Sequence, residues 1–161
     1  MKRVLLAALL ATAGPAWAQM AWAQAPDIQV DQPWARATPG GGKSGVVYLT
    51  LIDHGGPDTL TGISTPAAGM AMLHESFDDN GVARMRMLDG LKLDPRAPVA
   101  LRPGGMHVML TDLVQPLRVG ATFPLTLTFA KASPVTVTVR VLKIGSPGPA
   151  SDMPGMKGMA Q

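Results

Sequence analysis

Two neighbouring stretches, TFPLTLTF at residues 122–129 and PVTVTVRV at residues 134–141, decide the fold class. In both, large apolar residues alternate with threonine or another non-core residue, so one face of an extended chain is hydrophobic and the other polar. Similar short runs lie at 45–52, 71–77, 82–88 and 98–113, separated by Gly, Pro, Asp and Asn. About seven short strands with frequent turns predict an all-β domain, an antiparallel β-sandwich or Greek-key barrel.

The stretch DDNG at residues 78–81 is the strongest turn signal of the chain. Asn-Gly flanked by alternating runs is typical of a two-residue β-hairpin turn, because both positions need positive φ angles. We therefore expect residues 71–77 and 82–88 to form one hairpin.

The N-terminus has the pattern of a secretory signal over residues 1–23. Lys2 and Arg3 precede an apolar run at 4–13, and small residues then allow cleavage after Ala18 or after Ala23. The apolar run is too short to span a bilayer. The sequence predicts an exported, periplasmic protein without stable membrane insertion.

The mature chain is predicted to hold one domain over 28–144, followed by a flexible, Met-rich tail over 145–161 that is rich in Gly, Pro and Ser. The formal charge of the whole chain is +3, but Lys2 and Arg3 contribute two of these charges. Lys and Arg form no patch with aromatic residues, so nucleic acid is not an expected partner. The absence of cysteine excludes thiolate zinc sites, iron–sulfur clusters and blue-copper centres.

The stretch LRPGGMHVML at residues 101–110 raises the possibility of a soft-metal site. In a strand, His107 and Met109 share one face, while Met106, Val108 and Leu110 share the other and can supply core. The alternative is a core strand that carries one His and one Met by chance.

His74 and Met85 complete the pattern His-X10-Met-X21-His-X-Met with this pair. This spacing is the signature of the periplasmic copper chaperones of the PCu(A)C family, which the chain resembles over residues 28–142. MLHES (72–76), DNGVARM (79–85) and PLTLTF (124–129) are also similar to the family. The resemblance implies a cupredoxin-like β-barrel that binds Cu(I) through His74, Met85, His107 and Met109. It also implies delivery of copper to the CuA centre in subunit II of cytochrome c oxidase, alongside Sco-type thiol proteins.

The donor types agree with this chemistry, because thioether sulfur selects Cu(I) and imidazole suits copper in general. Met85 and Met87 share a strand face and could both be core, and Met87 is the substitute ligand if the register slips. Met70 and Met72 are expected to form a hydrophobic rim. His54 is expected in a solvated loop, and Glu75 should point away from His74.

Other functions remain open from the sequence. We expect a monomer and no enzyme, since three histidines are few for a redox copper enzyme and no catalytic triad or carboxylate pair stands out. The alternatives are a copper-resistance or copper-storage protein on the same fold, and an interaction module with incidental methionines. Met153, Met156 and Met159 of the tail either form a second, weaker soft-metal site or have no binding role.

Overall fold

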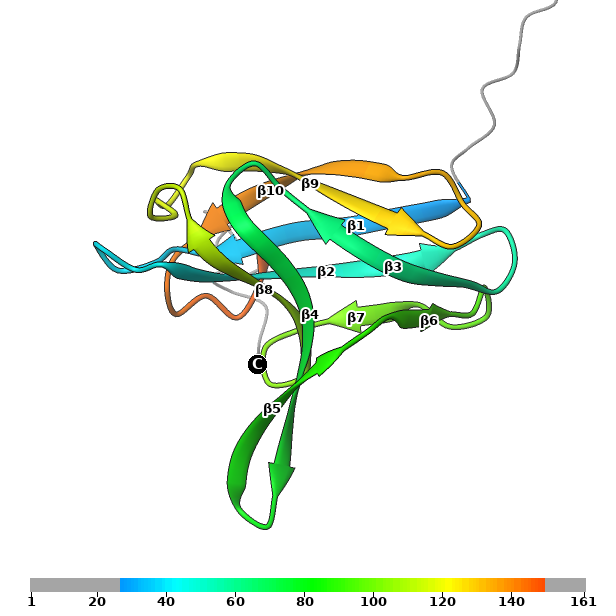
Figure 1. Cartoon of the computed structure of the whole chain (residues 1–161), viewed down its shortest axis with the longest axis horizontal. Coiled ribbons are helices and arrows are strands. Elements are labelled where there is room, and N and C mark those ends of the chain that lie inside the picture. Colours follow the sequence, from blue (N-terminus) through cyan, green and yellow to red (C-terminus); the bar gives the residue numbers. More distant parts are fainter. Residues whose placement is uncertain (1–26, 150–161) are drawn as a thin grey trace, which may run out of the picture.

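The computed structural model describes residues 27–149, which form ten strands and no α-helix (Figure 1). No helix among these residues is long and apolar enough to cross a membrane. The strands are β1 (Ile28–Arg36), β2 (Ser44–Asp53), β3 (Asp58–Ser64), β4 (Ala68–Asp79), β5 (Val82–Leu88), β6 (Leu91–Leu93), β7 (Val99–Leu101), β8 (Met106–Leu113), β9 (Thr122–Phe129) and β10 (Val135–Leu142).

The strands follow the order β5-β4-β8-β2-β1-β10-β9-β3-β6, with β7 paired to β2. This sheet curls into a sandwich, with β9, β10 and β3 lying over the layer that contains β2 and β8 (Figure 1). The predicted all-β sandwich is confirmed. The prediction of purely antiparallel pairing misses one contact, because β1 and β10 run parallel, with Trp34 opposite Arg140. Parallel neighbours need a long crossover connection, and here nearly the whole domain lies between these two strands.

The core consists of the apolar faces that the sequence pattern predicts. Phe123, Leu125, Leu127 and Phe129 of β9 are buried. On β8, Val108 and Leu110 are fully buried, and the half-buried Met106 packs against the same cluster. The apolar face of β8 is therefore used entirely for folding, which leaves the opposite face of this strand available for another purpose.

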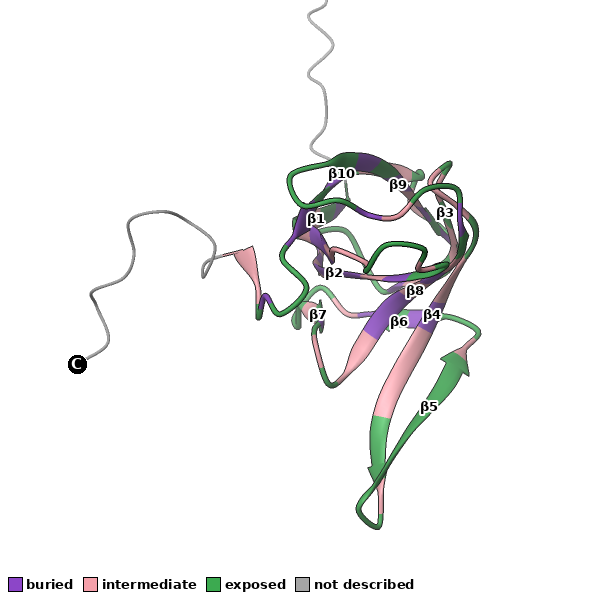
Figure 2. Ribbon diagram, turned by 90° about the vertical axis from the view of Figure 1, so that its left-hand side faces the viewer, coloured by how far each residue is buried: buried purple, intermediate pink, exposed green. Residues whose placement is uncertain are grey.

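The hairpin of β4 and β5 projects from the body of the sandwich (Figures 1 and 2). Asn80 and Gly81 form its turn with φ angles of 55° and 85°, as predicted for Asn-Gly. On one face of the hairpin, Arg86 pairs with Glu75 at 2.6 Å, so Glu75 points away from His74 as predicted. β5 is the terminal strand of the sheet order, and most of its residues are exposed.

The predicted signal at 1–23 and the three methionines of the predicted tail lie outside the described residues. The first residues of the segment assigned to the tail are described, and they pack on the domain. Ser146 is only 3% exposed, and its carbonyl accepts a hydrogen bond from Arg36 Nε at 3.0 Å. A Gly/Pro-rich composition did not reveal this anchoring, because it depends on a side chain of β1.

Candidate metal centre

Strand register brings the two predicted histidine ligands side by side. In the pairing of β4 with β8, His74 lies opposite His107, and Met72 lies opposite Met109. In the pairing of β4 with β5, His74 lies opposite Met87. Directly paired residues point to the same face of a sheet, so the side chains of both rows project from the face opposite the core.

His107 is held in one orientation by the turn that precedes it. The residue is 5% exposed, and its Nδ1 lies 3.0 Å from the carbonyl oxygen of Gly105. A carbonyl can only accept, so the neutral ring donates its Nδ1–H and keeps a lone pair on Nε2. The same carbonyl accepts the N–H of Ser76 on β4 at 3.1 Å, and Gly104 supplies the positive φ of 81° that the turn needs. The turn therefore prepares Nε2 of His107 as a donor to a metal.

One ring nitrogen of His74 has no hydrogen-bond partner among the described residues. The ring centroid of His74 lies 6.0 Å from that of His107, with the planes at 71°. Its Nδ1 is buried and makes no hydrogen bond to any residue between 27 and 149. Buried polar atoms are nearly always paired, so an unpaired ring nitrogen beside a second imidazole fits a metal ligand.

The methionines around the histidines differ in exposure. Met72 and Met109 are half-buried, whereas Met85 and Met87 are 58% and 59% exposed. The alternative that Met85 and Met87 are core residues is therefore wrong. Met85 lies opposite Ser76. Ser76 is the next residue after His74 on the same face of β4, so Met85 lies nearer the hairpin turn than His74 does. Long side chains can reach across such a diagonal, so Met85 as well as the directly opposite Met87 can approach His74.

An aromatic wall next to His107 was not found from the sequence. The ring of Tyr48 lies 6.4 Å from that of His107, and the ring of Trp34 lies 4.6 Å from that of Tyr48. Burial raises the pKa of Tyr48, and the nearby charge of Arg36 opposes this shift. The phenol therefore stays neutral at neutral pH. Because this wall depends on the pairing of β1 with β2, no local motif predicts it.

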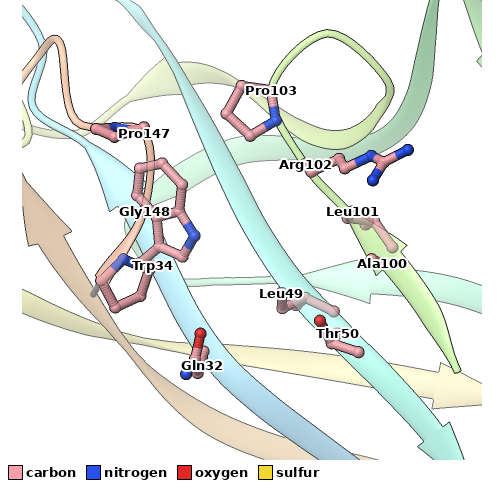
Figure 3. A pocket seen from close by; sticks show the side chains of 11 residues that line it. Gln32, Trp34, Leu49, Thr50, Ala100, Leu101, Arg102, Pro103, Pro147 and Gly148 are labelled. Carbon is pink, nitrogen blue, oxygen red and sulfur yellow. The ribbon is translucent and has the colours of Figure 1, made fainter. Parts of the chain in front are cut away.

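Trp34 of this aromatic pair also lines a cavity of about 310 Å³ (Figure 3). The cavity is also lined by Leu49, by Arg102 and Pro103 of the turn before β8, and by Pro147. The cavity contains neither of the two histidines, so it is a neighbour of the candidate metal centre and not part of it.

Met70 and His54, which the sequence did not predict as ligands, are both exposed. Met70 is 52% exposed and lies opposite Thr111, two rows from His74. His54 is exposed in a loop, and its Nε2 lies 3.0 Å from Gln29 Oε1. Within residues 27–149, no group of three or more His, Cys, Asp and Glu could hold a metal. The donors gathered on this face are therefore imidazole and thioether groups, without a carboxylate cluster.

Asp58 is a deeply buried carboxylate with a structural role. Asp58 accepts hydrogen bonds from the N–H groups of Thr59, Lys131 and Ala132 at 2.7, 3.0 and 2.8 Å. Burial acts to raise the pKa of Asp58, but these N–H groups and the charge of Lys131 outweigh it and hold the pKa below its ordinary value. Asp58 fastens the start of β3 to the turn after β9.

An all-β sandwich with two histidines and several methionines on one sheet face defines a protein class suited to soft metal ions. Comparison with known proteins gives the family. Residues 28–141 match the family described as "Putative lipoprotein LpqE-like", and the chain belongs to this family. It is 33% identical over 129 residues to "Putative lipoprotein Lxx21020" of Leifsonia xyli subsp. xyli, covering 78% of this chain and 77% of that protein. It is also 31% identical to "Uncharacterized protein RP573" of Rickettsia prowazekii, over 68% of this chain and 64% of that one.

Solved structures agree on the fold. The copper-bound PCuAC domain from PmoF2 is 28% identical, with a TM-score of 0.62 over 73% of this chain and 93% of that domain. The solution structure of CuI-DR1885 from Deinococcus radiodurans is 34% identical, with a TM-score of 0.59 over 78% of this chain and 85% of that one. The resemblance to the PCu(A)C family noted in the sequence is thus confirmed at the level of family and fold.

Proposed function

We propose that this protein is a copper chaperone that binds one Cu(I) ion as cargo through His74, Met85, His107 and Met109. The observation that carries the proposal is the pairing of His74 with His107 on the outer sheet face. One ring has an unpaired buried Nδ1, and the other has its Nδ1–H fixed by a backbone carbonyl. Met87, directly opposite His74, is the alternative to Met85 as the ligand from β5.

The donor set suits a carrier. All four side chains bind as neutral groups, so binding releases no proton from a thiol and leaves the site with the single charge of the ion. Cysteine thiolates of an acceptor are stronger donors to Cu(I) and could replace these ligands one at a time. A site built from His and Met also cannot be closed by disulfide formation in an oxidising compartment.

The solved relatives support copper as the cargo. The PmoF2 domain is described as copper-bound, and DR1885 was solved with Cu(I). The set of four ligands is the one that the resemblance to the PCu(A)C signature implies. The strand register supports it by pairing His74 with His107 and by placing Met109 in the next row of the same face.

Export and delivery complete the proposal. We place the protein in the periplasm, and the relatives named as lipoproteins support an exported protein. The acceptor is proposed to be the CuA centre in subunit II of cytochrome c oxidase, with Sco-type thiol proteins as further partners. The protein is proposed to act as a monomer and without catalytic activity.

Titration with Cu(I) against a chromophoric chelator tests the binding step. We expect one tight equivalent per folded domain and no competition by Zn²⁺. His107→Ala should abolish the tight site, while Met70→Ala, which removes an exposed methionine two rows away, should leave it unchanged. The absence of stoichiometric Cu(I) binding by the folded wild-type protein would contradict the proposal.

A further inference from the structure

The two most exposed methionines among residues 27–149 lie at the edge of the candidate metal centre. Met85 and Met87 are 58% and 59% exposed, whereas Met72, Met106 and Met109 are half-buried. Both exposed residues belong to β5, the terminal strand of the sheet order. Reagents dissolved in water therefore reach these two thioethers before those of β8.

An exposed thioether is open to oxidation by a peroxide. The sulfur lone pair attacks the peroxide oxygen, an S–O bond forms as the O–O bond breaks, and the products are methionine sulfoxide and water. A sulfoxide presents a hard oxygen in place of a soft sulfur, and Cu(I) and Ag(I) prefer the soft donor. When the lone pair is donated to a metal ion, it is no longer free to attack the peroxide.

We propose that Met85 and Met87 form a peroxide-sensitive modification site, at which oxidation to sulfoxide weakens the binding of a soft monovalent ion and the bound ion protects the methionine that ligates it. This inference rests on the proposed function, because it assumes that the ion binds beside His74. The reagent is hydrogen peroxide. Methionine sulfoxide reductases reverse the change.

The hairpin can accept this oxidation without unfolding. Met85 and Met87 are largely solvated, so the added oxygen displaces no core contact. The opposite face of the hairpin is held by the Arg84–Asp79 pair at 2.7 Å and the Arg86–Glu75 pair at 2.6 Å. The change is therefore expected to alter the donor set and leave the fold intact.

The test treats the full mature chain with hydrogen peroxide, with and without one equivalent of Ag(I). Cleavage before aspartates releases residues 79–88, which carry both methionines, and tandem mass spectrometry separates their oxidation. In the metal-free chain, both should oxidise faster than Met109. With Ag(I) bound, at least one should be protected, while Met70, which is 52% exposed, should oxidise at an unchanged rate.

The affinity for Ag(I) is then compared before and after oxidation. We expect a loss of at least about tenfold, recovery after treatment with methionine sulfoxide reductases, and an unchanged circular dichroism spectrum. The double variant Met85→Leu, Met87→Leu should lose no further affinity on oxidation. Unchanged affinity after both residues are oxidised would overturn this inference alone. Failure of the untreated chain to bind Ag(I) would overturn the proposed function as well.

Discussion

The two faces of β8 carry different kinds of residues for different reasons. On the inner face, Val108 and Leu110 are fully buried in the main core, and Met106 packs against it. On the outer face, His107 is also buried, but beside a second histidine and half-buried methionines instead of aliphatic side chains. Burial explains the inner face completely. It does not explain two imidazoles paired across neighbouring strands, with methionines in the adjoining register positions, so the outer face points to binding.

The largest effect that separates the two faces is expected from Leu110→Ala. Removing this buried side chain should lower the free energy of unfolding by about 3 kcal/mol, because a cavity remains where the side chain packed. Urea unfolding monitored by circular dichroism measures this loss. The Cu(I) affinity of the folded molecules should stay that of the wild type; a parallel loss of affinity would show that the two faces are not independent.

A smaller effect distinguishes the methionines of the outer face. Met109→Ala should weaken Cu(I) binding by about tenfold or more, and by more than Met87→Ala, while both variants stay folded. Met109 adjoins His107 on β8, whereas Met87 lies on the exposed edge strand. Competition with a chromophoric chelator decides the order. If Met87→Ala does the greater harm, the ligand from β5 is Met87, which lies directly opposite His74.

The smallest effect concerns the methionines at 153, 156 and 159, outside the described residues. Three thioethers on one short segment could bind a second soft ion, but the composition predicts a flexible segment, and ordering such a segment would cost about 1–2 kcal/mol per residue. We therefore expect the mature chain to bind a second, weaker equivalent of Ag(I). Deletion of residues 150–161 should remove this equivalent and spare the first. The deletion begins after Pro149 because Ser146 is packed on the domain. Equal stoichiometry in the two proteins would show that the segment binds no ion.

Local sequence signals predicted the elements that carry the site. The alternating pattern of residues 106–110 predicted which residues lie on each face of β8. The Asn-Gly turn predicted the hairpin of β4 and β5. The same turn also fixes the register, because a two-residue loop at Asn80 and Gly81 places Met87 opposite His74. The row that joins these two residues could therefore have been found from the sequence.

Long-range pairings were beyond the sequence pattern. The parallel contact of β1 with β10 joins the two ends of the domain, and no local signal reports it. The strand β3 was missed because its sequence, DTLTGIS, is polar and contains a glycine at a register shift. Tyr48 and Trp34 come together beside His107 only through the pairing of β1, β2 and β8. Each of these features depends on residues that are distant in the chain.

The most direct test of the central claim is X-ray absorption at the copper edge of the Cu(I)-loaded protein. The account predicts a mixed shell of sulfur and nitrogen scatterers, from the methionines and from His74 and His107. His107→Ala should lower the nitrogen contribution. An all-nitrogen shell in the wild-type protein would contradict the assignment of methionine ligands on the outer face of β8.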